Sequence, residues 1–242
     1  DNKSQVLKED PIATEVGLDP AQQSLADALR VSFWILGGAI AVLLGFFLFS
    51  GAYSVGPNEV AVPLLMGAYS GDPSDRVRTT GTYLAAPFPL MEVIKVDTRP
   101  RTIAINDSFW YELTDRDSGK GRDQLRQAKS RPLNPTRDGS LLTGDFNIIH
   151  ARWDVEYSVN DPQAYLSNVG SISLADRLVR CAAEQGIVHA VARAEADQAL
   201  KGLANRELAV SLAQRGLDDM GTGLRIENMT LQEVAAPFSV VS

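Results

Sequence analysis

The chain has 242 residues, of which 45% are hydrophobic and 22% are charged, and its formal net charge is −7. Because binding to phosphate backbones needs concentrated lysine and arginine, this acidic balance argues against nucleic acid as a main partner. The single cysteine, Cys181, excludes a disulfide within the chain. We expect Cys181 to be a small core residue on an apolar helix.

The first predicted element is the uncharged apolar stretch Val31–Phe49. At about 1.5 Å per residue, a helix of this length spans about 28 Å, close to the hydrocarbon thickness of a bilayer. We therefore predict an N-terminal tail over 1–30 and a single transmembrane helix over 31–52. Asp19-Pro20 favours a helix start within the tail, because Asp caps helices and Pro suits the first helical position. The side chains expected to contact membrane lipid are Phe33, Trp34, Ile35, Leu36, Leu43, Leu44, Phe46, Phe47 and Phe49.

Two other interpretations of this stretch stay open. A buried core helix is also apolar, although core helices rarely stay apolar on every face over such a length. A cleavable signal peptide is apolar too, and Ser50, Gly51 and Ala52 resemble the small residues of a cleavage site. The basic residues nearest to the stretch predict its orientation. Arg30 directly precedes the stretch, and the next basic residue after it is Arg76. Because basic residues close to a membrane span stay on the cytoplasmic side, this arrangement favours a cytoplasmic N-terminus.

Short strands are predicted after the apolar stretch. The turn signal Gly56-Pro57-Asn58 precedes an apolar run, Val60–Met66, which is typical of a buried strand. Val93–Arg99 and Arg101–Asn106 are further short strands, separated by Pro100. The first half of the chain after the apolar stretch is therefore expected to be mainly β-structure.

Gly81–Met91 is predicted to be an apolar loop, because Pro87 and Pro89 cannot lie in a central strand. One hypothesis is that this loop folds onto the core. The other is that it presses an apolar tip against the lipid beside the anchor. In that case its membrane-contacting residues are Phe88, Leu90 and Met91.

Residues 107–140 form a polar insertion that is rich in charged residues, Gly and Pro. We expect a solvated segment with one or two helical turns around Asp123–Lys129. Its exception is the aromatic triplet Phe109-Trp110-Tyr111. Three aromatics in a polar segment favour an anchor that folds back on the domain, with partner binding as the alternative.

The second half of the domain combines strands and helices. Ile149–Val159 alternates strictly between apolar and polar residues, which predicts a strand with one packed face. Asp161-Pro162 then starts a short helix. Ser171–Leu200 has helical periodicity with two apolar stripes, which is more apolar surface than a single sheet would cover. Gly186, in the middle of this helix, indicates a kink or a close approach of another backbone segment. The residues that we expect to contact a neighbouring subunit are Trp153, Tyr157, Leu174, Leu178 and Val188.

A second helix is predicted over Asn205–Met220, where Gly221 and Gly223 stop it. Leu224–Val234 then returns as a strand. The order strand, helix, helix, strand indicates an α+β fold class for this domain.

Several motifs resemble the SPFH superfamily, which includes stomatin, prohibitin, flotillin and the bacterial proteins HflK and HflC. Val55-Gly56-Pro57-Asn58-Glu59 is similar to the family's turn into its first strand, and Pro87-Phe88-Pro89 is similar to its proline loop. The most specific run is Leu142-Thr143-Gly144-Asp145, continued by Val155 through Asp161-Pro162. This opening resembles HflK more than HflC.

The resemblance implies two consecutive SPFH (band-7) subdomains of mixed strands and helices, over 53–145 and 146–242, behind the single anchor. It implies a scaffold subunit of a ring or cage that alternates with an HflC-like paralogue. Such an assembly would surround and regulate an FtsH-type AAA protease. The location implied is the bacterial inner membrane, with the bulk of the chain on the periplasmic side.

No catalytic, metal or cofactor site is predicted. His150 lies on the polar face of the alternating strand and His189 lies on a distant helix, so a zinc site has few ligands available. Two alternatives to the scaffold remain. One is a stomatin- or flotillin-like organiser of membrane microdomains without a protease partner. The other is a membrane-tethered hydrolase that uses Ser and Lys.

Overall fold

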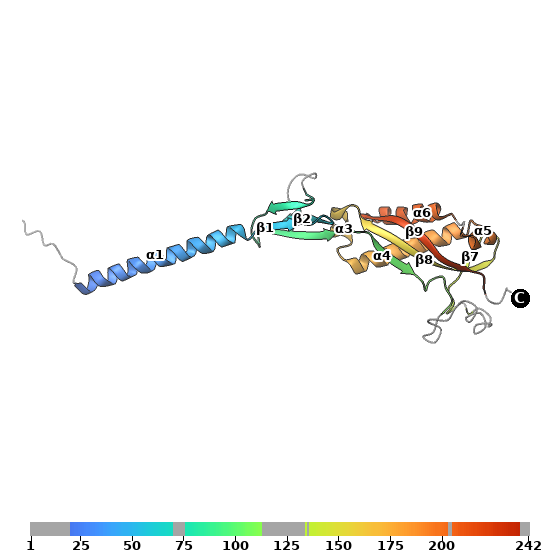
Figure 1. Cartoon of the computed structure of the whole chain (residues 1–242), viewed down its shortest axis with the longest axis horizontal. Helices are drawn as coiled ribbons and strands as arrows, with labels where there is room; N and C mark the ends of the chain where they lie inside the picture. Colours follow the sequence, from blue (N-terminus) through green and yellow to red (C-terminus); the bar gives the residue numbers. More distant parts are fainter. Residues whose placement is uncertain (1–19, 70–75, 113–133, 135, 203–204, 238–242) are drawn as a thin grey trace, which may run out of the picture. The chain divides into compact units, whose positions relative to one another are not determined.

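The computed structural model describes residues 20–69, 76–112, 134, 136–202 and 205–237 (Figure 1). The chain divides into two compact units, of which one ends at Gly51 and the other begins at Ala52. The helical turns expected around Asp123–Lys129 and the first nineteen residues of the predicted tail lie outside the described residues.

The first unit contains one helix, α1, over Pro20–Phe49. It begins at the Pro that the sequence marks as a first helical position. The expected tail over 1–30 is therefore already helical from Pro20 onward. The reason is local, because the stretch Ala21–Arg30 contains no Gly or Pro and is rich in the helix formers Ala, Leu and Gln.

The second unit starts with two small antiparallel sheets. Strand β1 (Ala52–Val55) pairs with β4 (Gly81–Leu84). Strand β2 (Glu59–Leu65) lies between β3 (Ala68–Tyr69) and β5 (Met91–Asp97). The prediction of a loop over all of Gly81–Met91 was therefore wrong at both ends. The two prolines exclude a strand only between β4 and β5, at residues 85–90.

The larger sheet is built around β8 (Ile148–Val159). Strands β6 (Arg101–Ile105) and β9 (Leu224–Ala235) pair with the same part of β8, so they occupy its two opposite edges. Strand β7 (Leu141–Leu142) forms a hairpin with the start of β8. Because β6 and β7 pair with β8, the sheets do not follow the predicted boundary between 53–145 and 146–242. Strands that are distant in the sequence pair with each other in this sheet, so its composition could not be predicted by dividing the sequence at one residue.

Four helices connect β8 to β9, namely α3 (Pro162–Asn168), α4 (Ile172–Val191), α5 (Ala196–Leu200) and α6 (Arg206–Asp219). The Asp161 side chain caps α3, accepting bonds from two backbone N–H groups as its sequence predicts. The single helix predicted over Ser171–Leu200 is interrupted after Val191. At this break the N–H of Gly144 donates a hydrogen bond to the carbonyl oxygen of Ala194. The turn between β7 and β8 therefore satisfies a carbonyl group that a continuous helix would hydrogen-bond internally.

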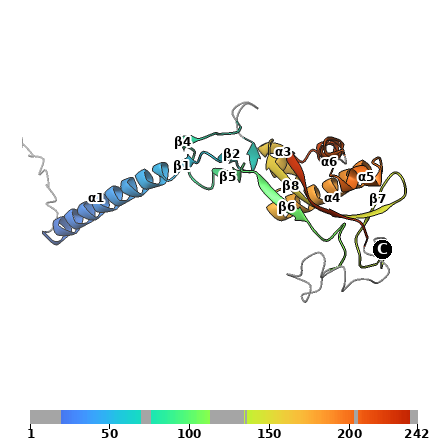
Figure 2. The same cartoon turned by 45° about the vertical axis from the view of Figure 1, so that its right-hand side comes forward.

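Helices α4 and α6 lie side by side, as both views show (Figures 1 and 2). A Cβ atom placed on Gly186 would lie 2.4 Å from the carbonyl oxygen of Ala209, nearer than real Cβ atoms approach. The predicted close approach at Gly186 is therefore confirmed. It lets the two helices pack as one layer against the sheet.

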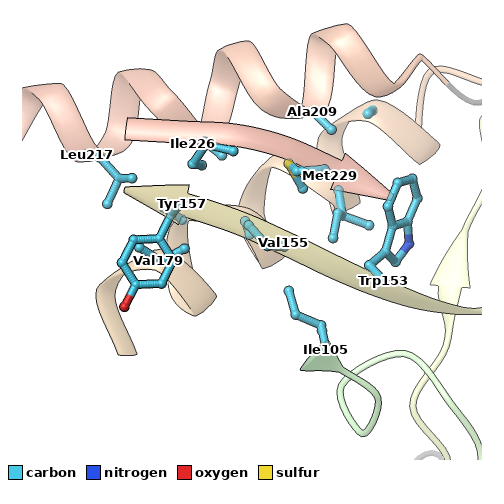
Figure 3. Packing of buried hydrophobic residues seen from close by; sticks show 14 of the residues in the cluster. Ile105, Trp153, Val155, Tyr157, Val179, Ala209, Leu217, Ile226 and Met229 are labelled. Carbon is cyan, nitrogen blue, oxygen red and sulfur yellow. The ribbon is translucent and has the colours of Figure 1, made fainter. Parts of the chain in front are cut away.

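The core of the second unit lies between this helix layer and the larger sheet. Figure 3 shows Val155 of β8 with Met229 of β9 and Leu217 of α6, and all three are fully buried. The predicted alternation of β8 is confirmed from Ala151 to Tyr157, where every second side chain is buried. His150 departs from it, because this residue of the expected polar face is buried as well.

Candidate functional site

The candidate membrane anchor is α1. All residues from Gln22 to Phe49 except the half-buried Gly45 are exposed, including all nine that the sequence assigns to lipid. By length and composition the helix could cross a membrane, although a signal sequence would satisfy the same criteria. A core helix of a soluble protein would be mostly buried, and α1 is not. We therefore expect this apolar surface to contact an apolar environment that the described part of the chain does not provide.

The second predicted lipid contact is the loop between β4 and β5. Phe88 and Leu90 are exposed there, whereas Met91 is half-buried as the first residue of β5. Leu84, at the end of β4, adds a large exposed apolar side chain that the sequence analysis did not single out. Pro87, in the same loop, is buried. The loop thus displays apolar side chains instead of folding all of them onto the core.

The predicted subunit contacts divide into two groups. Trp153 and Tyr157 are only 3% and 1% exposed, so their assignment to a subunit interface was wrong. These side chains point from the central strand into the core of their own chain. Leu174 and Leu178 are half-buried against the same core, and Val188 is exposed on α4. Of the five residues, only Val188 has an exposed side chain that a partner could contact.

A cavity of about 360 Å³ opens at the far end of β8, between β5 and helices α3 and α4. We call it the β8 cavity. Its walls are mainly apolar and include Val96, Val159, Leu166 and Ala175. The polar groups around it include Lys95, Arg101, Tyr157 and Tyr165. This cavity could not be predicted from the sequence, because the residues that line it come from five separate elements.

Tyr157 donates a hydrogen bond to the carboxylate of Asp176 at the wall of the β8 cavity. Burial, and then the bond to Asp176, raise the pKa of Tyr157 well above its usual value near 10, while nearby Arg101 acts in the opposite direction. The hydroxyl therefore stays protonated at physiological pH. It serves as a structural donor and not as a base.

The aromatic triplet of the insertion is folded back on the domain, as predicted. Phe109, Trp110 and Tyr111 are all buried. The N–H of Ala151 bonds to the carbonyl of Phe109 at 2.9 Å, which ties the triplet to β8. The guanidinium of Arg152 lies 4.4 Å from the centre of the Trp110 ring, within cation–π range.

His150 is the polar centre of this packing. Its Nδ1 lies 2.7 Å from the carbonyl oxygen of Gly139, and its ring meets the Tyr111 ring edge-on at 5.3 Å. Burial lowers the pKa of His150, although the bond to Gly139 and the charge of Asp138 act in the opposite direction. The sequence analysis placed His150 on a polar face, because nothing in the local pattern indicates that the insertion covers it.

The turn between β7 and β8 carries the most unusual side chain of the described surface. Phe146 is 84% exposed and has a positive φ of 63°, a conformation that bulky side chains rarely adopt. Leu142 and Ile148 pair across the hairpin on either side of it, and both are exposed. We call these three residues the contact tip. The neighbouring Leu142-Thr143-Gly144-Asp145 motif indicated only a family resemblance, and no pattern in the sequence predicted the tip.

Within the described part of the chain, no group of three or more His, Cys, Asp or Glu residues could hold a metal ion. The Nζ atom of Lys201 lies 2.5 Å from Asp197, and that of Lys95 lies 3.9 Å from Glu59.

Cys181 is exposed on α4, so the prediction that it lies in the core was wrong. The side of α4 that packs on α6 is occupied by smaller residues such as Ala182 and Gly186.

A comparison with known protein families finds no matching family model, and a comparison with curated proteins finds no match either. The function must therefore be argued from the chain's own residues. Three features carry that argument, namely an exposed apolar helix, a compact second unit of mixed strands and helices, and apolar surfaces displayed by that unit.

Proposed function

We propose that this chain is a membrane-anchored scaffold subunit without enzymatic activity, similar in role to HflK. In this proposal α1 (Pro20–Phe49) anchors the chain in a bacterial inner membrane by a single pass. The N-terminus lies in the cytoplasm and the second unit lies on the periplasmic side. Many copies, alternating with an HflC-like paralogue, form a ring or cage that sequesters an FtsH-type AAA protease and limits its access to substrates.

The exposed apolar surface of α1 is the observation that carries the proposal. A helix that no described part of the chain covers, and that is long enough for a bilayer, is best satisfied by lipid. Confinement to a membrane plane raises the effective concentration of the attached units. Weak lateral contacts between copies can then support a large assembly, which closes into a ring if the rotation between neighbours permits.

The test is purification of the tagged full chain from its native membrane in a mild detergent, followed by identification of the proteins that accompany it. We expect a particle of many copies together with a paralogue and an AAA protease. The Ile40→Arg variant of α1, which is expected to lose its membrane attachment, serves as the control for capture after lysis. Recovery of the chain as a monomer or dimer with neither companion contradicts the proposal.

A second candidate function is that of a stomatin- or flotillin-like organiser of membrane microdomains. The exposed Phe88 and Leu90 favour it, because an apolar loop can insert into a lipid surface. The same purification separates the two functions, since an organiser would yield a large assembly without an AAA protease. Labelling of the full chain by a serine-reactive probe would instead indicate a hydrolase.

A further inference from the structure

We propose that the β8 cavity binds an uncharged single-chain amphiphile, with the head group of the ligand at the hydroxyl of Tyr165. The ligand class is an alcohol, amide or ester with an apolar chain of about ten carbons. This inference goes beyond the proposed scaffold function and does not depend on it. It rests on three features of the second unit, namely the size and apolar walls of the cavity, a buried hydroxyl that lacks a partner in the described chain, and balanced charges.

The β8 cavity has the volume and the walls for a small apolar molecule. Its volume of about 360 Å³ is more than twice the roughly 150 Å³ of an apolar protein cavity that takes up benzene. By that ratio it holds about ten to fourteen non-hydrogen atoms. Val96, Val159 and Ala175 supply apolar walls, and burial of an apolar chain against them is favourable. Ile172, also in the lining, is 48% exposed, so the ligand can enter from outside.

Tyr165 of α3 brings a polar group into this apolar lining. The residue is only 6% exposed, and its hydroxyl makes no hydrogen bond to any residue that the structure describes. Burial raises the pKa of Tyr165, so the hydroxyl stays protonated and can donate. A buried donor without a partner costs free energy, and an acceptor on a ligand would recover that cost.

The two tyrosines of the lining lie at the same end of the cavity but differ in their partners. Arg101 and Asp176 act electrostatically on both hydroxyls, which places the hydroxyls near each other. Tyr157 already donates its hydrogen bond to the carboxylate of Asp176. Of the two tyrosines, only Tyr165 therefore has a donor left for a ligand.

The charges around the cavity balance, which favours a ligand without a charge. The charged groups that line the cavity or pair with its lining are the cations Lys95, Arg99 and Arg101 and the anions Glu59, Asp97 and Asp176. Each sign occurs equally often, so the charges sum to zero. An ionised head group would lose its water here without meeting an excess of opposite charge. A neutral acceptor needs only the hydroxyl of Tyr165.

Photolabelling of the full chain in its native membrane tests the site. The probe is 1-decanol with a diazirine in its chain, which bonds covalently to a neighbouring residue on illumination. Trypsin then releases residues 153–177, which contain most of the lining, and residues 31–76, which contain the apolar stretch of α1. We expect label on 153–177 to saturate as the probe concentration rises. Label on 31–76 should rise without saturation, because it reports probe that is dissolved in lipid.

Competition by unlabelled 1-decanol, decanoate and decylammonium tests the charge of the head group. We expect 1-decanol to compete at least about ten times more effectively than either ion, after correction for each competitor's effect on the label at 31–76. An ion that competes as well as 1-decanol overturns the inference, and so does label on 153–177 that does not saturate. Label there that appears only after the chain is purified from its companions also overturns it, because a protein would then fill the cavity in the membrane.

Tyr165→Phe tests the role of the hydroxyl. The variant removes a group that bonds to no described residue, so we expect no loss of thermal stability. Half-saturation of the label on 153–177 should need about 2- to 13-fold more probe, which corresponds to the loss of one hydrogen bond. Tyr83→Phe is the matched control, because Tyr83 lies on β4, outside the lining.

Three results of this comparison contradict the site. The first is an unchanged half-saturation in Tyr165→Phe, and the second is an equal shift in Tyr83→Phe. The third is a loss of thermal stability in Tyr165→Phe, because the hydroxyl would then serve the fold and not a ligand.

Discussion

His150 shows how one buried side chain can make the fold sensitive to pH. Because burial lowers its pKa, the folded chain takes up a proton at lower pH than the unfolded chain, whose His titrates near about 6.5. As the pH falls below about 6.5, the unfolded chain binds more protons than the folded chain. The free energy of unfolding then falls, by at most about 1.4 kcal/mol per pH unit for this one group. The fall ends below the pKa of the folded form.

The measurement is the thermal unfolding midpoint of the full chain in detergent, followed by aromatic circular dichroism between about pH 7.5 and 5. His150→Asn keeps a donor near the carbonyl of Gly139 but has no titrating ring, so its midpoint should fall less on acidification. His189→Gln, at an exposed position on α4, should follow the unsubstituted chain. If His150→Asn loses stability as steeply as the unsubstituted chain does, the pH sensitivity has another source.

At this scale, the sequence predicted the burial of single residues where a regular pattern continued. The alternation of β8 correctly placed Trp153, Val155 and Tyr157 on one face. It did not show that this face is the core of the same chain, which is why Trp153 and Tyr157 were assigned to a partner. His150 was missed for the corresponding reason, since the aromatic triplet that covers it comes from a distant insertion.

Helix α1 carries the prediction that concerns membrane attachment. Ile40 lies at the middle of the apolar stretch, where an arginine costs about 2.5–3.5 kcal/mol on insertion scales. Ile40→Arg should therefore reduce the equilibrium constant for membrane insertion by roughly 60- to 300-fold. Ile40→Leu should leave it unchanged. Carbonate extraction of membranes, which releases proteins that are not inserted, provides the measurement, and release of the unsubstituted chain would argue against a membrane span.

The contact between α4 and α6 provides a test of the helix layer. The Cβ atom of Gly186→Ala would meet the carbonyl of Ala209 at 2.4 Å, so the two helices must move apart. We expect a loss of about 1–3 kcal/mol in the free energy of unfolding. At Gly216 of α6, the nearest atom to an added Cβ is 3.9 Å away. Gly216→Ala should therefore gain about 0.5–1 kcal/mol, because Ala favours helix over Gly. Denaturant titration of both variants checks the prediction, and a similar effect of the two would contradict it.

Long elements could be predicted from the sequence, whereas very short ones could not. Helix α6 and strands β8 and β9 show sustained periodicity, and each lies within a few residues of its predicted range, whereas α4 begins where predicted but ends nine residues before Leu200. Strands β3 and β7 have two residues each, too few to show a period. They exist because a longer neighbour offers them partners. The contact tip depends on β7, so it could not be predicted from the sequence for the same reason.

At the scale of the whole molecule, two apolar surfaces of different kinds point to two kinds of environment. The surface of α1 extends along the whole helix and suits lipid, whereas the contact tip is small and held by hydrogen bonds, which suits contact with another protein. A chain with both could be held in a membrane and also bind its neighbours there. The scaffold proposal follows from this combination, with no catalytic group required among the described residues.

The central claim is that the anchored chain assembles into many-copy particles, and a mass measurement tests it most directly. The full chain should be extracted together with its native lipids in a membrane-solubilising polymer, and single particles should be weighed by mass photometry and imaged. We predict closed rings or cages of many copies. A population of monomers or dimers from the unsubstituted chain would contradict the account.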